Sequence, residues 1–185
     1  MEAGTGFWFR FCPRCGHALA RGERCSKCGY LQYRNPVAVT AGILLSTRAG
    51  LPPAGEEVPP EAATHILMVR RAATYAGSWC IPCGYVDYDE EIREATRREM
   101  LEETGLTVEV GRVWAVKSNF HNPGNHTVGI WFLTRHLGGE LRPGDDADGA
   151  EFVPLAAVSR PLAFPTDLEA IAALAAAAKR PEADA

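Results

Sequence analysis

The sequence predicts an α/β (α+β) fold, in which a mixed sheet is flanked by helices and preceded by a small cysteine-rich module. Three observations support this prediction: a pair of C-x-x-C-G repeats near the N-terminus, several apolar β-branched runs, and two separate helix-forming segments. Strands that surround one central and one terminal helix are typical of a sheet covered by helices. With 185 residues the chain can bury one main core. We therefore expect a module over residues 1–33 and one larger domain over residues 34–185.

The cysteine-rich module contains two C-x-x-C-G knuckles within residues 11–29, separated by nine residues. Each knuckle lets two thiolates face one ion, and the glycine that follows permits a tight turn. Four incidental buried cysteines are the alternative, but single cysteines do not repeat this spacing. A module of about 30 residues is too small for its own core, so a metal would supply its folding energy. We predict a structural Zn²⁺ ligated by Cys12, Cys15, Cys25 and Cys28.

The rest of the chain alternates between segments with strand and helix composition. Val37–Ser46 and His65–Arg71 are apolar runs of strand character, and a proline-rich loop at 51–64 separates them. Helix formers fill Glu91–Thr104, which ends at Gly105, and apolar side chains recur along one side of it. Further along the chain we expect strands at 106–118 and 126–136, a Gly/Asp-rich loop, a short strand near Phe152 and an alanine-rich helix at 167–179.

The predicted central helix carries three glutamates on one face. At 100° per residue, Glu99 and Glu103 lie about 40° apart, and Glu102 falls within the same third of the helix. Carboxylates so arranged repel one another, and an oxygen-preferring divalent cation such as Mg²⁺ removes that repulsion. Arg98 lies four residues from both Glu94 and Glu102, so it can orient Glu102. A solvated acidic face is the alternative interpretation.

The segment that contains this helix matches a known motif. Residues 84–106, GYVDYDEEIREATRREMLEETGL, satisfy the pattern G-x5-E-x7-R-E-U-x-E-E-x-G-U, with U aliphatic, at every defined position. The chain therefore resembles the Nudix hydrolases. That resemblance implies that the glutamates bind Mg²⁺ or Mn²⁺, which activates a water for attack on phosphorus. It assigns catalytic and metal-binding roles to Glu99, Glu102 and Glu103, supporting roles to Glu90 and Arg98, and a backbone approach to the metal at Gly84.

Two further cysteines, Cys80 and Cys83, lie just before this motif, which is known as the Nudix box. Cys83 stands where many relatives have glycine, and with Cys80 it forms a third C-x-x-C pair. A second metal or a redox pair is one interpretation. Because these cysteines lack a second knuckle, we favour a packing role.

A cysteine module ahead of a Nudix box resembles bacterial NADH pyrophosphatases and a zinc-ribbon group associated with ADP-ribose and flavin dinucleotide hydrolysis. The resemblance extends to the link at 33–36 and to residues 162–164. NADH pyrophosphatases carry an S-Q-P-W-P-F-P-x-S array after the box, whereas this chain has SNFHNPGNHTVGIWF from Ser118. The resemblance thus implies Mg²⁺-dependent hydrolysis of the diphosphate in ADP-ribose or in a dinucleotide such as FAD or NADH, releasing AMP, with NADH less favoured.

Two other functions stay open. One is a nucleoside triphosphate pyrophosphohydrolase, against which the cysteine module and residues 162–164 argue. The other is an inactive Nudix scaffold whose cysteine module binds RNA or protein, against which the intact Glu99, Glu102 and Glu103 argue.

Several side chains are candidates for substrate contact. Tyr33, Trp79 and Phe120 have rings suited to stacking on adenine, as has Trp114. For Trp114 and Phe120 the alternative is a place in the core as strand residues. His121 is a further candidate, and with His126 it could contact phosphate.

The catalytic base is sought in the Gly/Asp-rich residues 144–151, GDDADGAE, expected to form a loop mobile enough to close over a diphosphate. A solvated turn is the alternative. Among its acids, Asp145 and Asp146 lie at the tip. We favour Glu151, then Asp148, because they lie nearest the following strand, with Glu99 as the candidate if neither serves.

Charge and hydropathy narrow the partners. Nineteen basic and 23 acidic residues give a net charge of −4 without a block of like charges, so we expect a small-molecule nucleotide substrate rather than nucleic acid. No apolar stretch approaches the roughly 20 residues that a membrane helix needs. The N-terminus lacks the pattern of a signal peptide, so we expect a cytoplasmic protein. Nudix relatives are often dimers, which makes a homodimer our expectation.

Overall fold

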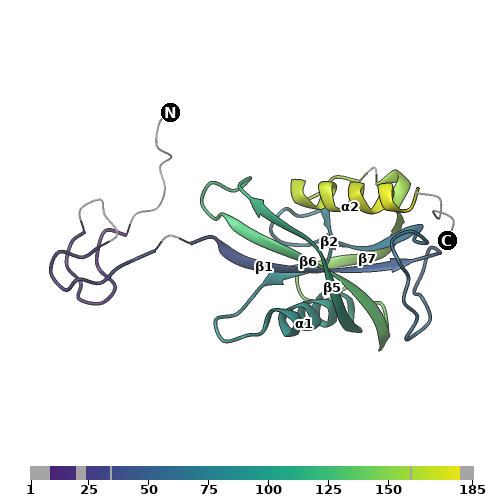
Figure 1. The fold of residues 1–185 in the computed structure, drawn as a ribbon, viewed down its shortest axis with the longest axis horizontal. Helices are drawn as coiled ribbons and strands as arrows, with labels where there is room; N and C mark the ends of the chain where they lie inside the picture. The colour runs from purple at the N-terminus through teal and green to yellow at the C-terminus, as the bar shows by residue number, and fades with distance from the viewer. Residues whose placement is uncertain (1–8, 20–23, 34, 159, 180–185) are drawn as a thin grey trace, which may run out of the picture.

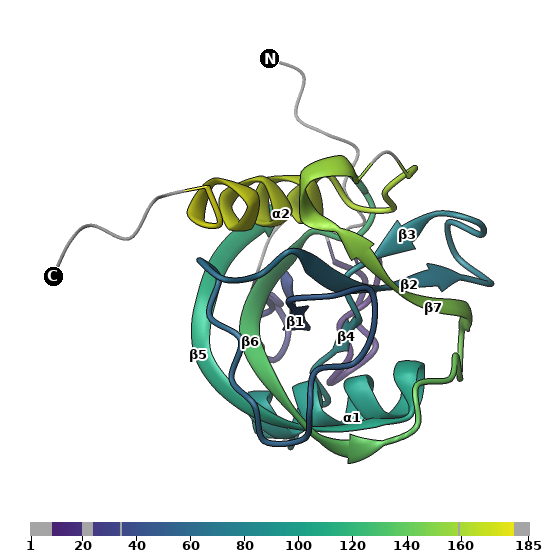
Figure 2. The ribbon, with the colours of Figure 1, turned by 90° about the vertical axis from the view of Figure 1, so that its right-hand side faces the viewer.

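The computed structural model describes residues 9–19, 24–33, 35–158 and 160–179. A mixed sheet lies between two helices, with α1 and α2 on opposite faces (Figures 1 and 2). The order of the strands in the sheet is β3-β2-β1-β6-β5. In addition, β4 pairs with β1, and β7 pairs with β2. The elements are β1 (Val37–Ser46), β2 (His65–Arg71), β3 (Trp79–Cys80), β4 (Cys83–Tyr85), α1 (Ile92–Thr104), β5 (Leu106–Asn119), β6 (Thr127–Gly139), β7 (Ala147–Pro154), the 3-10 turn η1 (Leu155–Ala157) and α2 (Pro165–Ala177).

Strand β1 joins the two halves of the sheet. Along most of its length it runs parallel to β6, whereas its other pairings are antiparallel. Its first half also pairs with β4 through Val39–Ala41, and its last two residues, Leu45 and Ser46, pair with β2. The mixed sheet expected from the sequence is therefore confirmed.

Both faces of the sheet are buried, and side chains alternate between them. On β1, Ile43 and Leu45 pack into a cluster that includes Ile171 and Leu174 of α2. Leu44, between them, packs into a second cluster with Met100 of α1. Because successive strand side chains point to opposite faces, one apolar run supplies both cores.

Helix α1 has clear ends. Glu91 is its N-cap, and the Glu91 carboxylate accepts hydrogen bonds from the N–H groups of Arg93 and Glu94. Gly105 ends the helix with a left-handed φ of 71°. The expected apolar stripe is confirmed, since Ala95 and Met100 are fully buried.

The later elements differ from expectation in one important place. Strand β7 begins at Ala147, so most of the segment expected to be a Gly/Asp-rich loop is extended chain paired with β2. Pairing with a buried neighbour overrides the turn preference of Asp and Gly. The two-residue and three-residue strands β3 and β4 were not expected, and α2 begins two residues before Asp167.

The cysteine module precedes the sheet domain and stands apart from it in Figure 1. The expected boundary between residues 33 and 34 adjoins Arg34, which lies outside the described residues, as does the start of the module at residues 1–8. None of the described helices has the length and apolar character needed to cross a membrane.

Candidate active site

A cavity of about 380 Å³ opens beside the N-terminal half of β1. Helix α1 and strand β4 line one part of it, and the segments that follow β2, β5 and η1 line another. From the Nudix-like motif, Gly84, Arg98, Glu99 and Glu103 line this cavity. The motif thus lies against a cavity rather than on an open helix face.

Glu103 is the most buried of the acidic side chains in the motif. Its relative exposure is 1%, and its carboxylate accepts a hydrogen bond of 2.9 Å from the Cys83 N–H. Burial, together with the nearby Cys80, raises the pKa of Glu103 to about 9. A bound cation would stabilise the charged form of a carboxyl group that is buried in this way.

Glu99 occupies the space that Gly84 leaves free. A Cβ built on Gly84 would overlap the Glu99 carboxyl group. Gly84 itself is fixed in β4 by pairing with Thr40 of β1. Burial raises the pKa of Glu99, although Arg98 beside it acts in the opposite direction. The absent side chain at Gly84 therefore sets the position of the Glu99 carboxylate.

Arg98 organises the acidic groups around it. Its guanidinium makes two bonds of 2.8 Å to Glu90 and single bonds of 2.6 Å to Glu99 and 3.1 Å to Glu102. It also donates to the Tyr85 carbonyl at 3.0 Å. The Arg98 guanidinium lowers the pKa of Glu90 to about 2, and these carboxylates raise the pKa of Arg98. The i,i+4 contact with Glu102 follows from the sequence spacing, whereas the bidentate contact with Glu90 required the fold.

The carboxylates supply the oxygen ligands that a hard divalent cation prefers. Glu99 and Glu103 offer oxygen ligands inside the cavity, next to the backbone at Gly84. Glu102 is more open, with a side chain that is 44% exposed. Within the described residues, the four cysteines are the one group of metal-ligating side chains gathered within 4.8 Å, so the box glutamates lie further apart.

The acidic residues considered for the base lie at different places. Asp145 and Asp146 line the cavity, and Asp146 forms an ion pair of 2.7 Å with Arg71. Asp148 instead pairs with Arg70 at 2.6 Å.

Glu151 pairs with Arg160 at 2.7 Å, and neither Glu151 nor Asp148 is among the residues that line the cavity. The choice of Glu151 or Asp148 as the base stays a prediction. Of the acids in this segment, Asp145 and Asp146, in the turn before β7, are the ones that line the cavity.

The turn that carries Asp145 is tied to helix α1. The N–H of Gly144 donates to the Glu103 carbonyl at 3.2 Å, and the N–H of Arg142 donates to the Thr104 carbonyl at 3.0 Å. These bonds satisfy carbonyl groups that a helix C-terminus leaves without intrahelical partners. The expected mobile loop is thus anchored at its start.

The aromatic residues expected to contact substrate do not line the cavity. Trp79 is buried in the core, and the Arg160 guanidinium lies 4.2 Å from its ring centre. Tyr33 and Phe120 are each 66% exposed, and the Phe120 ring contacts His126 edge-on. Of the two residues for which a core role was the alternative, Trp114 is partly buried against the core cluster, whereas Phe120 is exposed and is not a core residue.

Other rings take their place. Tyr75, His121 and Phe164 line the cavity, as do Trp131 and Asp167. Only His121 among these was considered from the sequence. A signal was present for Tyr75, since it lies on the short connection between two buried strands just ahead of the motif. The contribution of Phe164 depends on a turn that the sequence pattern does not reveal.

Asp167 is buried at the start of α2, which it links to the sheet. Its carboxylate accepts hydrogen bonds from the Ile81 N–H at 3.0 Å and the Trp131 indole at 3.1 Å. Burial raises the pKa of Asp167 to about 7. Both bonds fix the cavity wall formed by Trp131.

The third cysteine pair lies at the edge of the cavity. Cys80 is fully buried against Val69 and Ala163, while Cys83 is partly buried and lines the cavity. A hydrogen bond with the Cys80 thiol raises the pKa of Cys83, and burial raises it further. Both are free thiols in packed surroundings, so the packing role stays our interpretation.

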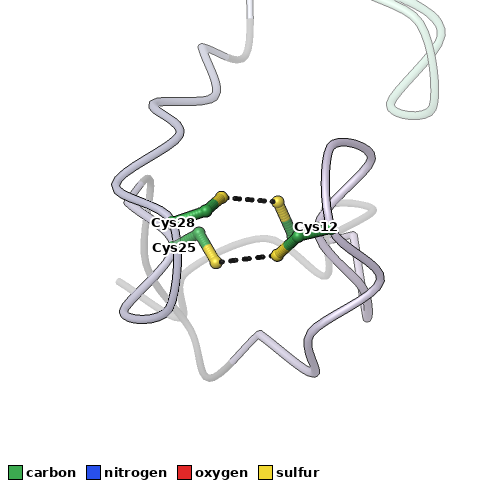
Figure 3. Close-up of side chains that lie close together, drawn as sticks. Cys12, Cys25 and Cys28 are labelled. Carbon is green, nitrogen blue, oxygen red and sulfur yellow. Dashed lines mark hydrogen bonds between the residues drawn. The ribbon is translucent and has the colours of Figure 1, made fainter.

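The four cysteines of the N-terminal module converge on one point (Figure 3). The Sγ atoms of Cys12 and Cys28 lie 3.6 Å apart, and those of Cys15 and Cys25 lie 3.7 Å apart. Four sulfurs at about 2.3 Å from a tetrahedral zinc lie about 3.8 Å from one another. The sulfur positions therefore fit Zn²⁺ and are too far apart for disulfides.

The two knuckles repeat the same backbone bonds. The N–H of Gly16 donates to the Cys12 carbonyl at 2.8 Å, and the N–H of Gly29 donates to the Cys25 carbonyl at 2.9 Å. Both glycines have left-handed φ values, of 67° and 72°. Backbone N–H groups, that of Cys28 first, lower the pKa of Cys25 to about 7, which favours the thiolate that binds metal.

A helix whose glutamates line a cavity beside a mixed sheet is suited to cation-assisted hydrolysis. Comparison with known families is specific: the model of the NUDIX domain matches residues 53–174, well over half of the chain. The protein therefore belongs to the Nudix family.

Named relatives and solved structures agree with this assignment. The chain is 38% identical over 91 residues to the ADP-ribose pyrophosphatase of Methanocaldococcus jannaschii, covering 49% of this chain and 54% of that protein. It is 31% identical over 150 residues to the RNA pyrophosphohydrolase of Cereibacter sphaeroides, covering 70% and 78%. A crystal structure of a NUDIX hydrolase from Nitrosomonas europaea superposes with a TM-score of 0.64 at 24% identity, covering 88% of each chain. The chain thus spans about half the length of the first of these relatives.

Proposed function

We propose that this protein hydrolyses the diphosphate bond of a nucleoside diphosphate linked to another group, with ADP-ribose as the first candidate. The observation that carries the proposal is the placement of Glu99, Glu103 and Arg98 in one cavity. Similarity to an enzyme named ADP-ribose pyrophosphatase supports the choice of substrate. Dinucleotides such as FAD and NADH have the same diphosphate linkage and are the next candidates.

Glu99 and Glu103 would hold the divalent cation, Mg²⁺ or Mn²⁺, with Glu102 as a further ligand. A bound cation of this kind neutralises diphosphate oxygens and lowers the pKa of a water molecule. Arg98 holds Glu99 and Glu102 through direct ion pairs, and Glu90 in turn holds Arg98. Their role is to keep the ligating carboxylates in one arrangement before the substrate arrives.

Asp145 is the proposed acceptor of the proton from the attacking water. It lines the cavity from the turn before β7. Asp146 lines it too, but its carboxylate is engaged in an ion pair with Arg71. Glu99 is the alternative, because burial raises its pKa.

The proposal is tested by incubating purified protein with Mg²⁺ and a panel of substrates, followed by identification of the products. The panel comprises ADP-ribose, NADH, FAD, diadenosine polyphosphates, nucleoside triphosphates and RNA with a 5′-triphosphate. We expect AMP and ribose 5-phosphate from ADP-ribose. Turnover confined to the triphosphates would overturn the substrate assignment.

Two variants connect activity to the site. Glu103→Gln should lose at least about a hundredfold in kcat while the fold is retained, because it removes ligand charge from the cation. Glu94→Gln is the matched control, since Glu94 is exposed on the same helix and pairs with Arg97. Equal activity of the two variants at saturating Mg²⁺ would refute the role of Glu103.

For the N-terminal module we propose one structural Zn²⁺, supported by the sulfur geometry. A cytoplasmic location and a homodimer remain predictions.

A further inference from the structure

We propose that Tyr75, His121 and Phe164 form an aromatic cradle that binds the nucleobase of the substrate. The inference rests on the proposed function, because it assigns the site for the base of the same nucleotide. These three rings come from three separate connections: between β2 and β3, between β5 and β6, and before α2. All three line the cavity that also contains Glu99 and Glu103.

The rings form a nearly regular triangle. Their centroids lie 5.7 Å apart for Tyr75 and His121, 5.7 Å for Tyr75 and Phe164, and 5.6 Å for His121 and Phe164. Spacings of this size are typical of interacting aromatic pairs. Rings from three separate connections therefore build one aromatic surface that lines the cavity.

The polar atoms of the cradle are bonded to one another. The Nδ1 atom of His121 contacts the Asn119 side-chain oxygen, which can only accept, so Nδ1 carries the proton. The Nε2 atom then accepts from the Tyr75 hydroxyl at 3.1 Å. With these atoms paired, what the cradle offers a ligand is mainly aromatic carbon, suited to stacking on a flat ring.

The backbone at Tyr75 argues for function rather than packing. Tyr75 has a φ of 61°, a left-handed conformation that is unfavourable for a non-glycine residue. Its side chain nevertheless remains 41% exposed, so core burial does not offset this cost. An exposed ring held in a strained turn at a cavity wall is better explained by a ligand.

The chemistry of the cavity selects the occupant. The lining of the cavity includes both the cradle and the carboxylates proposed to hold a cation. Arg71 connects the two, because its guanidinium lies 5.7 Å from the Phe164 ring centre and also pairs with Asp146. A nucleotide has a flat heteroaromatic base and an anionic phosphate group in one molecule, and it matches both parts.

Binding can be measured separately from catalysis. Isothermal titration calorimetry in buffer without Mg²⁺ or Mn²⁺ compares AMP with ribose 5-phosphate, which lacks the base. We expect AMP to bind at least about tenfold more tightly to the wild-type protein, and Tyr75→Ala and Phe164→Leu to remove most of that difference. Tyr75→Phe should keep the affinity within about threefold, since it retains the ring. Tyr88→Ala is the matched control, because Tyr88 is fully exposed and does not line the cavity.

A second variant separates binding from folding. Tyr75→Gly relieves the left-handed φ, so its thermal stability should stay close to that of the wild-type protein while AMP affinity falls as in Tyr75→Ala. Equal affinity of the wild type for AMP and ribose 5-phosphate would overturn the cradle, as would unchanged AMP affinity in Tyr75→Ala.

The cradle and the proposed function can fail independently. If the wild type cleaves ADP-ribose and Tyr75→Ala does so with unchanged KM, the cradle is wrong and the activity stands. If AMP binding depends on Tyr75 but no diphosphate substrate is cleaved, the activity is wrong and the cradle stands.

Discussion

At the scale of single residues, Gly84 acts through the side chain it lacks. The Glu99 carboxyl fills the space that a Cβ at this position would need. Gly84→Ala should therefore displace Glu99 and lower kcat/KM at least about tenfold, with a higher Mg²⁺ concentration required for half-maximal activity. Steady-state kinetics over a range of Mg²⁺ concentrations measures both effects. Gly50→Ala is the control, because a Cβ there meets no atom within 4 Å; equal kinetics of the two variants would contradict this account.

Glu103 gives the metal-free protein a characteristic pH dependence. Burial raises the pKa of Glu103 from 4.5 to about 9. Between these values the folded protein holds a proton that the unfolded chain has released, so stability falls as pH rises. Asp167 acts in the same direction only up to about pH 7, so of these two carboxyl groups only Glu103 acts between pH 7 and 9.

The measurement is urea denaturation of zinc-loaded protein in buffer without Mg²⁺ or Mn²⁺. The wild type should lose stability from pH 7 to 9, by at most about 1.4 kcal/mol per pH unit for one proton. Glu103→Gln mimics the protonated acid and should show a smaller loss, whereas Glu94→Gln should follow the wild type. A Glu103→Gln profile as steep as that of the wild type would exclude Glu103 as the source.

At the scale of elements, Gly105 ends α1 and fixes the start of β5. Its φ of 71° is left-handed, and a Cβ would overlap the Glu140 carbonyl oxygen. Gly105→Ala should lower the free energy of unfolding by about 2 kcal/mol. Gly138→Ala should change it by less than about 0.5 kcal/mol, since a Cβ there meets no atom within 4 Å. Chemical denaturation at pH 7 compares them, and similar losses in both variants would refute the capping role.

Elements with strong local signals could be predicted from the sequence. The limits of β1 and β2 are those expected, and α1 differs by one residue, because apolar runs and a C-terminal glycine define them locally. Strands β3 and β4 are too short for a periodic pattern. Strand β7 depends on its pairing with β2, and a single sequence gives no sign of such long-range pairing.

The same division applies to the site. The motif glutamates could be located from spacing on one helix, and the four-cysteine cluster from a repeated knuckle. Glu151 was favoured by distance along the chain, but the strand that contains it directs it to Arg160. The rings of Tyr75 and Phe164 meet through tertiary structure, so no local pattern could connect them.

At the scale of the whole molecule, the cysteine module and the sheet domain depend on different forces. The sheet domain buries three apolar clusters, whereas the module is organised around four sulfurs. We expect one zinc per chain, lost in Cys25→Ser and retained in Cys83→Ser. Metal analysis of the purified variants measures this stoichiometry. Zinc retained in Cys25→Ser but lost in Cys83→Ser would transfer the site to the third cysteine pair.

The hydrogen bonds from Arg142 and Gly144 to the end of α1 also have a consequence for the timing of motions. Because these two amides donate to carbonyls of Thr104 and Glu103, they open only when the last turn of the helix opens. In hydrogen–deuterium exchange these two amides should be protected to the same degree as the amides of that turn. They should also exchange more slowly than the amides of the exposed loop at Asn122–Gly124. The turn bearing Asp145 and the helix bearing the glutamates would then fluctuate as one cooperative unit. The proposed proton acceptor and the proposed ligands would thus keep their positions relative to one another.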